Sequence, residues 1–378
     1  MIRLFRNFLL YLYIILAPLL NSLQDVTIGG SNVVAVVSSC LCLIGVSTSV
    51  LNLKKNKYFS FVVLLVFIYG VYRTGLSQCL IGLVILVLLY VSFLNLDSKI
   101  DIKKVFYAYY CAIILAAFFS VSQGIMGSYV KRMATLVDGS IAVVTVAILL
   151  FANNNYLQER KKNFIKLAVV GSVIAVIAFS MSRSRLILVL GLVIVKLLFI
   201  KDKSSRRKSK SIIYVLIGII VLYVLSQTSL GSVLFGSMTA RFESGMESKG
   251  RNDEMLFALT LFANNPIWGS GWSDFMYTDY LTQEVGYNQH SMYVALLARG
   301  GIVFALVVLV SLYLVLKNTI RIYKYNKLPA ILMVLFLMLA YGNAGFFNYT
   351  ICGFFIPIIT ILQQENKRIG NGIDVYHK

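Results

Sequence analysis

The stretch that decides the fold class runs from residue 164 to residue 200 and reads FIKLAVVGSVIAVIAFSMSRSRLILVLGLVIVKLLFI. It contains two apolar runs, 164–182 and 184–200, which meet at the pair Arg183 and Arg185. An apolar run of roughly 20 residues is long enough to cross the hydrocarbon core of a bilayer as a helix. The stretch therefore predicts two membrane-spanning helices that are joined by almost no loop.

The same pattern recurs along the chain and predicts about twelve spans. The predicted spans are 8–24, 33–52, 59–73, 77–95, 105–123, 138–153, 164–182, 184–200, 211–226, 290–316, 328–345 and 351–364. Of the 378 residues, 59% are hydrophobic and 13% are charged, and a soluble domain of that composition could not present a polar surface. We therefore expect an all-α, polytopic integral membrane protein in which residues 1–378 form a single transmembrane domain.

Lysine and arginine are concentrated in every second predicted link. These basic links are 54–57, 99–104, 160–162, 201–210, 317–327 and 367–368. With both termini in the cytoplasm, all of them lie on the cytoplasmic side, as the positive-inside rule requires. The net charge of +20 is then a signal of topology. Because the cations are scattered over short loops and do not form one basic face, we expect no binding of nucleic acid.

Residues 227–289 form the longest predicted external link. Within it, the stretch 251–266, RNDEMLFALTLFANNP, predicts a short amphipathic helix that Pro266 ends. Three of its apolar residues share one face of that helix: Met255, Leu259 and Phe262. Such a stripe is typical of a helix that lies on the membrane surface or against the bundle. Loops of this length are uncommon unless they have a function.

Aromatic residues and one histidine follow that helix. The aromatic side chains are Trp268, Trp272, Phe275, Tyr277, Tyr280 and Tyr287. An ordinary belt of interfacial aromatic residues would explain any one of them, and the alternative is stacking on the apolar faces of sugars. The chain has two histidines, and His290, directly after Asn288 and Gln289, lies at the external boundary of the tenth span.

Four arginines are predicted on the same external side as His290: Arg183, Arg185, Arg241 and Arg251. Snorkelling to lipid headgroups is one explanation for the first two. The other is an anion, because guanidinium groups bind phosphate oxygens bidentately and a neutral histidine accepts a proton from a hydroxyl. The set suits transfer of a group from a lipid diphosphate to a hydroxyl. The arginines would stabilise the growing charge of the leaving group, so we expect neither a metal nor another cofactor.

A transporter of lipid-linked oligosaccharides is the alternative from another class. Such a protein should carry ionisable residues near the middle of the bilayer, often in broken helices. Here the clear ionisable residues lie at the external rim, apart from Lys196 near the inner end of its span. This distribution favours an enzyme.

At these residues the chain resembles the O-antigen polymerase/ligase superfamily, which comprises Wzy-type repeat-unit polymerases and WaaL-type O-antigen ligases. The matching motifs, in family order between about residues 180 and 305, are Ser180-Met181-Ser182-Arg183, Arg241-Phe242, Gly250-Arg251, Asn265 to Gly271, and His290-Ser291 with Gly300-Gly301. Two features depart from the family pattern. Arg185 stands where a small residue is common, and the carboxylate that follows the histidine in ligases is missing, with Tyr293 nearby.

The resemblance implies a metal-independent glycosyltransferase of the bacterial inner membrane, with its active site on the periplasmic side. Its donor and acceptor would be undecaprenyl-diphosphate-linked oligosaccharides, and a chain-length regulator protein is a further expected partner. The residues expected to bind the diphosphate are Arg183, Arg241, Arg251 and Arg185. His290 is the expected general base. The residues expected to contact the acceptor glycan are Tyr287, Asn288, Trp272 and Tyr280.

The residues around His290 favour a polymerase of O-antigen or capsular polysaccharide over the alternative, a ligase that transfers the glycan to lipid A-core. Residues 272–291 contain no lysine or arginine, but they include three acidic residues, Asp274, Asp279 and Glu284. An acidic and aromatic acceptor side suits an uncharged glycan better than a phosphorylated lipid core.

Overall fold

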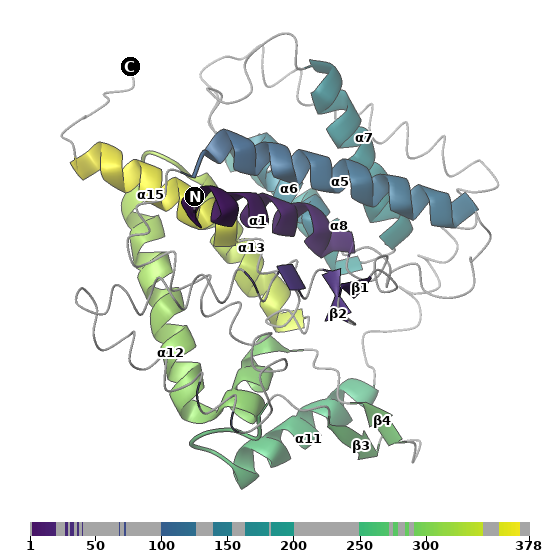
Figure 1. Cartoon of the computed structure of the whole chain (residues 1–378), viewed down its shortest axis with the longest axis vertical. Coiled ribbons are helices and arrows are strands. Elements are labelled where there is room, and N and C mark those ends of the chain that lie inside the picture. The colour runs from purple at the N-terminus through teal and green to yellow at the C-terminus, as the bar shows by residue number, and fades with distance from the viewer. Residues whose placement is uncertain are drawn as a thin grey trace. The chain divides into compact units, whose positions relative to one another are not determined.

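The computed structural model describes part of the chain. The described residues are 2–19, 27–28, 31–33, 36–37, 40, 68, 72, 100–125, 139–152, 163–180, 183–199, 249–271, 275–278, 284–286, 291–342 and 355–370. They are mostly helical (Figure 1), which confirms the predicted all-α class. Apart from isolated positions, four predicted spans lie outside the described residues: 33–52, 59–73, 77–95 and 211–226.

Up to residue 199, the described residues form five helices, a 3-10 turn and one small hairpin. They are α1 (Ile2–Leu16), the 3-10 turn Ala17–Leu19, β1 (Thr27–Ile28), β2 (Ser31–Asn32), α5 (Ile102–Ile125), α6 (Ser140–Phe151), α7 (Asn163–Ser180) and α8 (Arg183–Phe199). Strands β1 and β2 pair antiparallel. The sequence did not predict this hairpin.

From residue 249 onward, the part of the chain that the structure describes forms four helices and a second hairpin. They are α11 (Lys249–Asn264), β3 (Met276–Thr278), β4 (Glu284–Gly286), α12 (Met292–Ile322), α13 (Leu328–Gly342) and α15 (Phe355–Gly370). Strands β3 and β4 are antiparallel, with Met276 opposite Gly286 and Thr278 opposite Glu284.

Eight of the predicted spans overlap described helices, and α1 begins at Ile2, six residues before its predicted span 8–24. α5 to α8 begin and end within three residues of the predicted spans. α12 continues to Ile322, six residues beyond its predicted end, and α15 begins at Phe355 and continues six residues beyond residue 364. Both extensions contain lysine, arginine and asparagine. Hydropathy detects only the apolar run, so it does not detect the polar turns by which a helix continues beyond that run.

Among the described residues, one helix is long and apolar enough to cross a membrane, Ile102–Ser122. A second qualifies if Tyr293–Leu306 and Val308–Ile322, which meet at 63°, count as one broken span. Shorter apolar helices lie at Asn7–Leu19, Ser140–Phe151, Phe164–Ile177 and Leu328–Ala340. The count of twelve spans stays a prediction.

The chain divides into two compact units. The first comprises Met1–Tyr109 and Ser248–Lys378, and the second comprises Tyr110–Glu247, so that the boundary falls within α5. In the first unit, α12 packs against α11, α13 and α15, and Phe336 of α13 meets the ring of Phe355 of α15 edge to face at 4.3 Å. In the second unit, α6 packs against α7 and α8.

Helices α6 and α8 run in the same direction. At their N-terminal ends, Arg185 Nε donates a hydrogen bond to Ser140 Oγ at 3.4 Å. At their C-terminal ends, Lys196 Nζ lies 5.7 Å from the centre of the Phe151 ring. Each contact joins residues 45 positions apart, which is possible along both helices only if they are parallel. In a chain that crosses the membrane back and forth, the sixth and eighth spans must be parallel, as α6 and α8 are. The direction in which they cross a membrane stays a prediction.

Candidate functional site

The turn that follows α11 is bonded, backbone to backbone, to a break in α12. Gly301 interrupts α12 with φ 64° and ψ −172°. Four hydrogen bonds of 2.9–3.2 Å join residues 266–271 to residues 298–303. Their N–H to carbonyl pairs are Ser270 to Ala298, Gly271 to Arg299, Ile302 to Pro266 and Val303 to Ile267. Because a broken helix leaves backbone groups without intrahelical partners, this turn supplies the partners that the break requires.

The motif glycines are necessary for this close contact. A Cβ on Gly269, whose φ is 72°, would lie 2.2 Å from the carbonyl oxygen of Arg299. A Cβ on Gly301 would lie 2.4 Å from the carbonyl oxygen of Ile267. Both positions need a positive φ as well, which side chains other than glycine rarely adopt. The two family motifs, Asn265 to Gly271 and Gly300-Gly301, thus form one structural feature.

The face of α11 that packs against α12 differs from the predicted apolar stripe. Ala258 is buried against Ala298 of α12, and Phe257 and Leu261 pack beside this pair. Two residues of the predicted stripe are instead exposed, Met255 by 48% and Leu259 by 42%. The prediction that this stripe packs against the bundle is therefore wrong. The small side chain of Ala258 lets α11 approach α12 more closely on another face. Contact of the stripe with a membrane surface stays a prediction.

Helix α11 and the first part of α12 also run in the same direction. Ala258 of α11 meets Ala298 of α12, and Pro266 and Ile267, beyond the end of α11, bond to Ile302 and Val303, further along α12. Going back seven residues from each alanine reaches Arg251 and Ser291. The pairing therefore places the start of α11, with Arg251, at the same end as the start of α12, whose preceding residue is His290.

Both helix starts at this end are electrostatically suited to an anion. Neither α11 nor α12 has an acidic residue in its first turn, and a helix N-terminus carries a partial positive charge. Ser291, in an extended conformation, caps α12 without a side-chain hydrogen bond. The side chain of Arg251 and the whole of His290 lie outside the described residues, so their mutual distance stays a prediction.

The β3–β4 hairpin supplies aromatic side chains that pack onto this helix pair. The ring of Tyr277 stacks on that of Phe257 at 5.3 Å and an interplanar angle of 22°. The guanidinium carbon of Arg299 lies 5.7 Å from the centre of the Phe275 ring. Phe275 and Tyr277 therefore have packing roles. The sequence analysis did not identify Arg299. Its only signal in the sequence is its position directly before Gly300 and Gly301.

In the second unit, the N-terminal ends of α6 and α8 meet, and two of the four predicted arginines lie there. Arg183 begins α8, and Arg185 is half-buried and donates to the buried Ser140. Neither helix has an acidic residue in its first turn. Arg185 therefore contacts protein, which differs from a side chain that only snorkels to headgroups. The sequence did not predict the role of Ser140.

The predicted site residues fall into three groups. Arg183 and Arg185 lie together at the start of α8, in one unit, and Arg251 lies at the start of α11, in the other. The remaining six lie outside the described residues: Arg241, His290, Trp272, Tyr280, Tyr287 and Asn288. Gathering of all four arginines around His290 stays a prediction.

Tyr293 has a hydrogen-bond partner on a neighbouring helix. The hydroxyl of Tyr293, which stands near the position of the ligases' carboxylate, donates to the carbonyl oxygen of Leu337 at 3.3 Å and so links α12 to α13. In the described part of the chain, no group of three or more histidine, cysteine, aspartate or glutamate side chains is placed to hold a metal ion. The metal-independent reaction stays a prediction.

The fold and the site define a class of protein. In its described part it is mostly helical, with at least one helix long and apolar enough to cross a membrane, and Arg183, Arg185 and Arg251 lie in the first turns of α8 and α11. Residues 168–309 match the family model described as O-antigen ligase. Over these residues the match supports the predicted resemblance to the O-antigen polymerase/ligase superfamily, a membrane-associated family of polysaccharide biosynthesis. No curated protein matches the chain.

The matched segment contains most of the site described above, whereas Ser140 of α6 and Leu337 of α13 lie outside it. It begins within α7 and ends within α12, so that it includes α8, α11, the β3–β4 hairpin and the Gly301 break. It also includes every predicted site residue. The match supports a ligase or polymerase function in the membrane without separating the two.

Proposed function

We propose that the protein is a membrane glycosyltransferase that polymerises undecaprenyl-diphosphate-linked repeat units into O-antigen or capsular polysaccharide. One observation carries the proposal. Within or beside the family segment, two pairs of parallel helices each bring a predicted arginine to a shared N-terminal end, at α6 and α8 and at α11 and α12.

The start of the α6 and α8 pair suits the diphosphate of the donor. Two helix N-termini there present partial positive charge, and Arg183 and Arg185 add two full charges. When the bond between the sugar anomeric carbon and the diphosphate oxygen breaks, the negative charge on the leaving lipid diphosphate grows. Groups that are already oriented toward that charge lower the barrier, which is the largest contribution in many enzymes. Arg241 and Arg251 would add to this binding.

The acceptor hydroxyl reacts at the start of α12. In its neutral form, His290 takes the proton of the hydroxyl at the nonreducing end of the acceptor glycan as the new glycosidic bond forms. The leaving diphosphate remains on its undecaprenyl carrier, and the proton remains on His290 until solvent removes it. In this scheme Trp272, Tyr280, Tyr287 and Asn288 hold the acceptor sugars.

A ligase is the second candidate, because the description of the matching family is O-antigen ligase. Both enzymes would use the same donor, so the arginines do not separate them. The acceptor does: the acidic and aromatic composition around His290 favours an uncharged glycan over phosphorylated lipid A-core.

The deciding experiment is a reconstituted reaction with lipid-diphosphate-linked single repeat units and no lipid A-core. A ladder of longer lipid-linked glycans is the result expected of a polymerase. Product that forms only after lipid A-core is added would establish the ligase instead. Conversion of neither acceptor, by protein that is folded and inserted, would contradict both. Adding a chain-length regulator protein should change the length distribution of the ladder and leave the chemistry unchanged.

Two variants test the residue roles in the same assay. His290→Ala should lower the rate by about 10²- to 10⁴-fold, the usual contribution of a general base, whereas normal polymer would exclude that role. Arg183→Lys should be nearly as damaging as Arg183→Ala, because lysine keeps the charge and loses the two-pronged geometry. Full activity of the lysine variant would contradict bidentate binding.

A further inference from the structure

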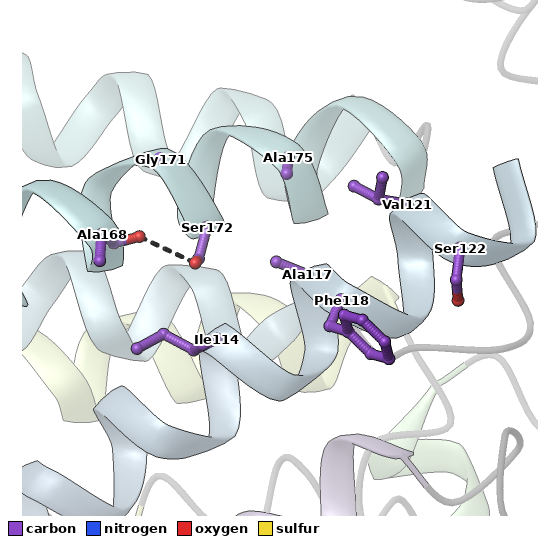
Figure 2. Close-up of a pocket in the computed structure, with 9 residues that line it drawn as sticks. All are labelled: Ile114, Ala117, Phe118, Val121, Ser122, Ala168, Gly171, Ser172 and Ala175. Atoms are coloured by element: carbon purple, nitrogen blue, oxygen red, sulfur yellow. Dashed lines mark hydrogen bonds between the residues drawn. The ribbon is translucent and has the colours of Figure 1, made fainter. Parts of the chain in front are cut away.

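Helices α5 and α7 line an open groove of about 500 Å³ in the second unit. Figure 2 shows the nine residues that line it. They are Ile114, Ala117, Phe118, Val121 and Ser122 of α5, and Ala168, Gly171, Ser172 and Ala175 of α7. A volume of this size lies within the range of small-molecule sites, roughly 300–1,000 Å³. None of the lining residues belongs to the site described above.

The walls of the groove are almost entirely hydrocarbon. No charged side chain lines it, and its two hydroxyl groups donate to their own helices. Ser172 Oγ donates to the carbonyl oxygen of Ala168 at 2.8 Å, as Figure 2 shows, and Ser122 Oγ donates to that of Phe119 at 3.0 Å. A polar ligand would lose its hydration here without gaining donors, so the groove suits an apolar occupant.

The groove leads toward the arginine end of the same unit. Its lining residues run in the same order along both helices, from Ile114 and Ala168 to Ser122 and Ala175 (Figure 2). Residues 168 and 175 are separated by about 10 Å of helix at 1.5 Å per residue. Beyond Ala175, α7 continues for five residues to Ser180, and α8 then begins at Arg183.

We propose that this groove holds the polyprenyl chain of the lipid diphosphate donor next to its headgroup. The inference rests on the proposed function, which places the diphosphate at Arg183 and Arg185. Two observations favour this occupant. The hydrocarbon walls of the groove suit an apolar chain, and Arg183 and Arg185, which follow α7 beyond the Ala175 end of the groove, suit a diphosphate. α5 also supplies the described helix that is long enough to cross a membrane, so the groove can admit a chain directly from the bilayer.

Gly171 allows the groove to be filled without disturbing the backbone. A Cβ added at Gly171 would meet no atom within 4 Å, and the same is true of Gly191 in α8, which does not line the groove. Gly171→Leu and Gly191→Leu are therefore matched variants in the middle of two helices of one unit. Only the first places a branched side chain where the polyprenyl chain would lie.

The test compares both variants with wild-type full-length protein in lipid nanodiscs, using two donors that carry the same glycan diphosphate. One donor has a long polyprenyl chain, and the other has a short prenyl chain that does not reach the groove. For Gly171→Leu, KM for the long-chain donor should rise about tenfold, the factor for roughly two methylene groups that lose burial. KM for the short-chain donor should change little, and Gly191→Leu should match wild type with both.

Equal behaviour of the two leucine variants with the long-chain donor would overturn the groove proposal while leaving the enzymatic proposal intact. Absence of any lipid-diphosphate-dependent product with wild-type protein would remove both. Should Gly171→Leu fail to fold, a photoreactive long-chain donor offers a direct measurement on wild-type protein. Labelling of the peptide that contains Gly171 supports the proposal, and labelling confined to other peptides contradicts it. Disulfide cross-linking of two chains through Ser172→Cys, with donor use unchanged, would assign the groove to a contact between copies.

Discussion

The two parallel helix pairs resemble each other in direction and differ in what holds them together. Side chains join α6 and α8, at Ser140 with Arg185 and at Phe151 with Lys196. Backbone hydrogen bonds join the turn after α11 to the break in α12. A contact made by side chains can be weakened one group at a time, whereas a contact made by backbone depends on the absence of a Cβ. Substitutions should therefore have graded effects in the first pair and severe effects in the second.

Gly301→Ala should have the largest effect on stability. The added Cβ would lie 2.4 Å from the carbonyl oxygen of Ile267, and the residue would keep a φ of 64°. Backbone strain of this kind costs about 1–3 kcal/mol, and the clash with backbone adds to that cost. We expect a marked loss of folded protein, measured as the thermal unfolding midpoint in detergent.

Gly191→Ala is the matched control for that variant, because its Cβ meets no atom within 4 Å. It should be neutral or stabilise the helix by up to about 1 kcal/mol, the difference in helix propensity between the two residues. Equal unfolding midpoints for the two alanine variants would show that the backbone contact does not hold α11 to α12.

Ala258→Leu should have the next largest effect. Ala258 and Ala298 are 1% and 0% exposed where α11 meets α12, and extra methylene groups in a close contact cost about 1–3 kcal/mol. Ala263→Leu is the control, because Ala263 is exposed on the same helix. The thermal midpoint of the first variant should fall and that of the second should stay unchanged. A fall of the same size in both would locate the effect outside the contact.

Ser140→Ala should have a moderate effect with a functional signature. It removes the hydroxyl that accepts the hydrogen bond of Arg185, and such a bond contributes about 1 kcal/mol. Because Arg185 would lose its orientation toward the diphosphate, we expect a higher KM for the donor. Ser120→Ala removes a hydroxyl bonded within its own helix, to the carbonyl oxygen of Ala116, and should leave that KM unchanged. A rise in both variants would contradict the role of Arg185.

Lys196→Met should have the smallest effect. The ammonium group lies 5.7 Å from the centre of the Phe151 ring, and such contacts contribute about 0.5–1 kcal/mol at exposed sites. A double-mutant cycle with Phe151→Leu measures the pair directly. The effect of Lys196→Met should disappear in the leucine background, and an undiminished effect would show that the lysine acts elsewhere.

The success of the sequence predictions follows the physical origin of each signal. Hydropathy predicted the ends of α5 to α8 within three residues. A run of apolar residues is a local feature of the sequence, so it can be recognised without knowing how the helices pack. The same signal failed on α11. Its sequence has apolar residues on more than one side, and which side packs depends on the partner: Ala258 is selected by Ala298, 40 positions away.

By itself, the sequence predicted the helical class, the resemblance to the O-antigen polymerase/ligase superfamily and the candidate residues of the site. These depend on local hydropathy and on short motifs whose residues are close in the chain. Only the tertiary structure decided that Gly269 and Gly301 belong to one backbone contact, that Ser140 holds Arg185, and that Arg251 and Ser291 start parallel helices at one end. Each of these pairs joins residues 32 to 45 positions apart. Such pairings depend on how helices pack, and the spacing of residues within one helix carries no record of its partner.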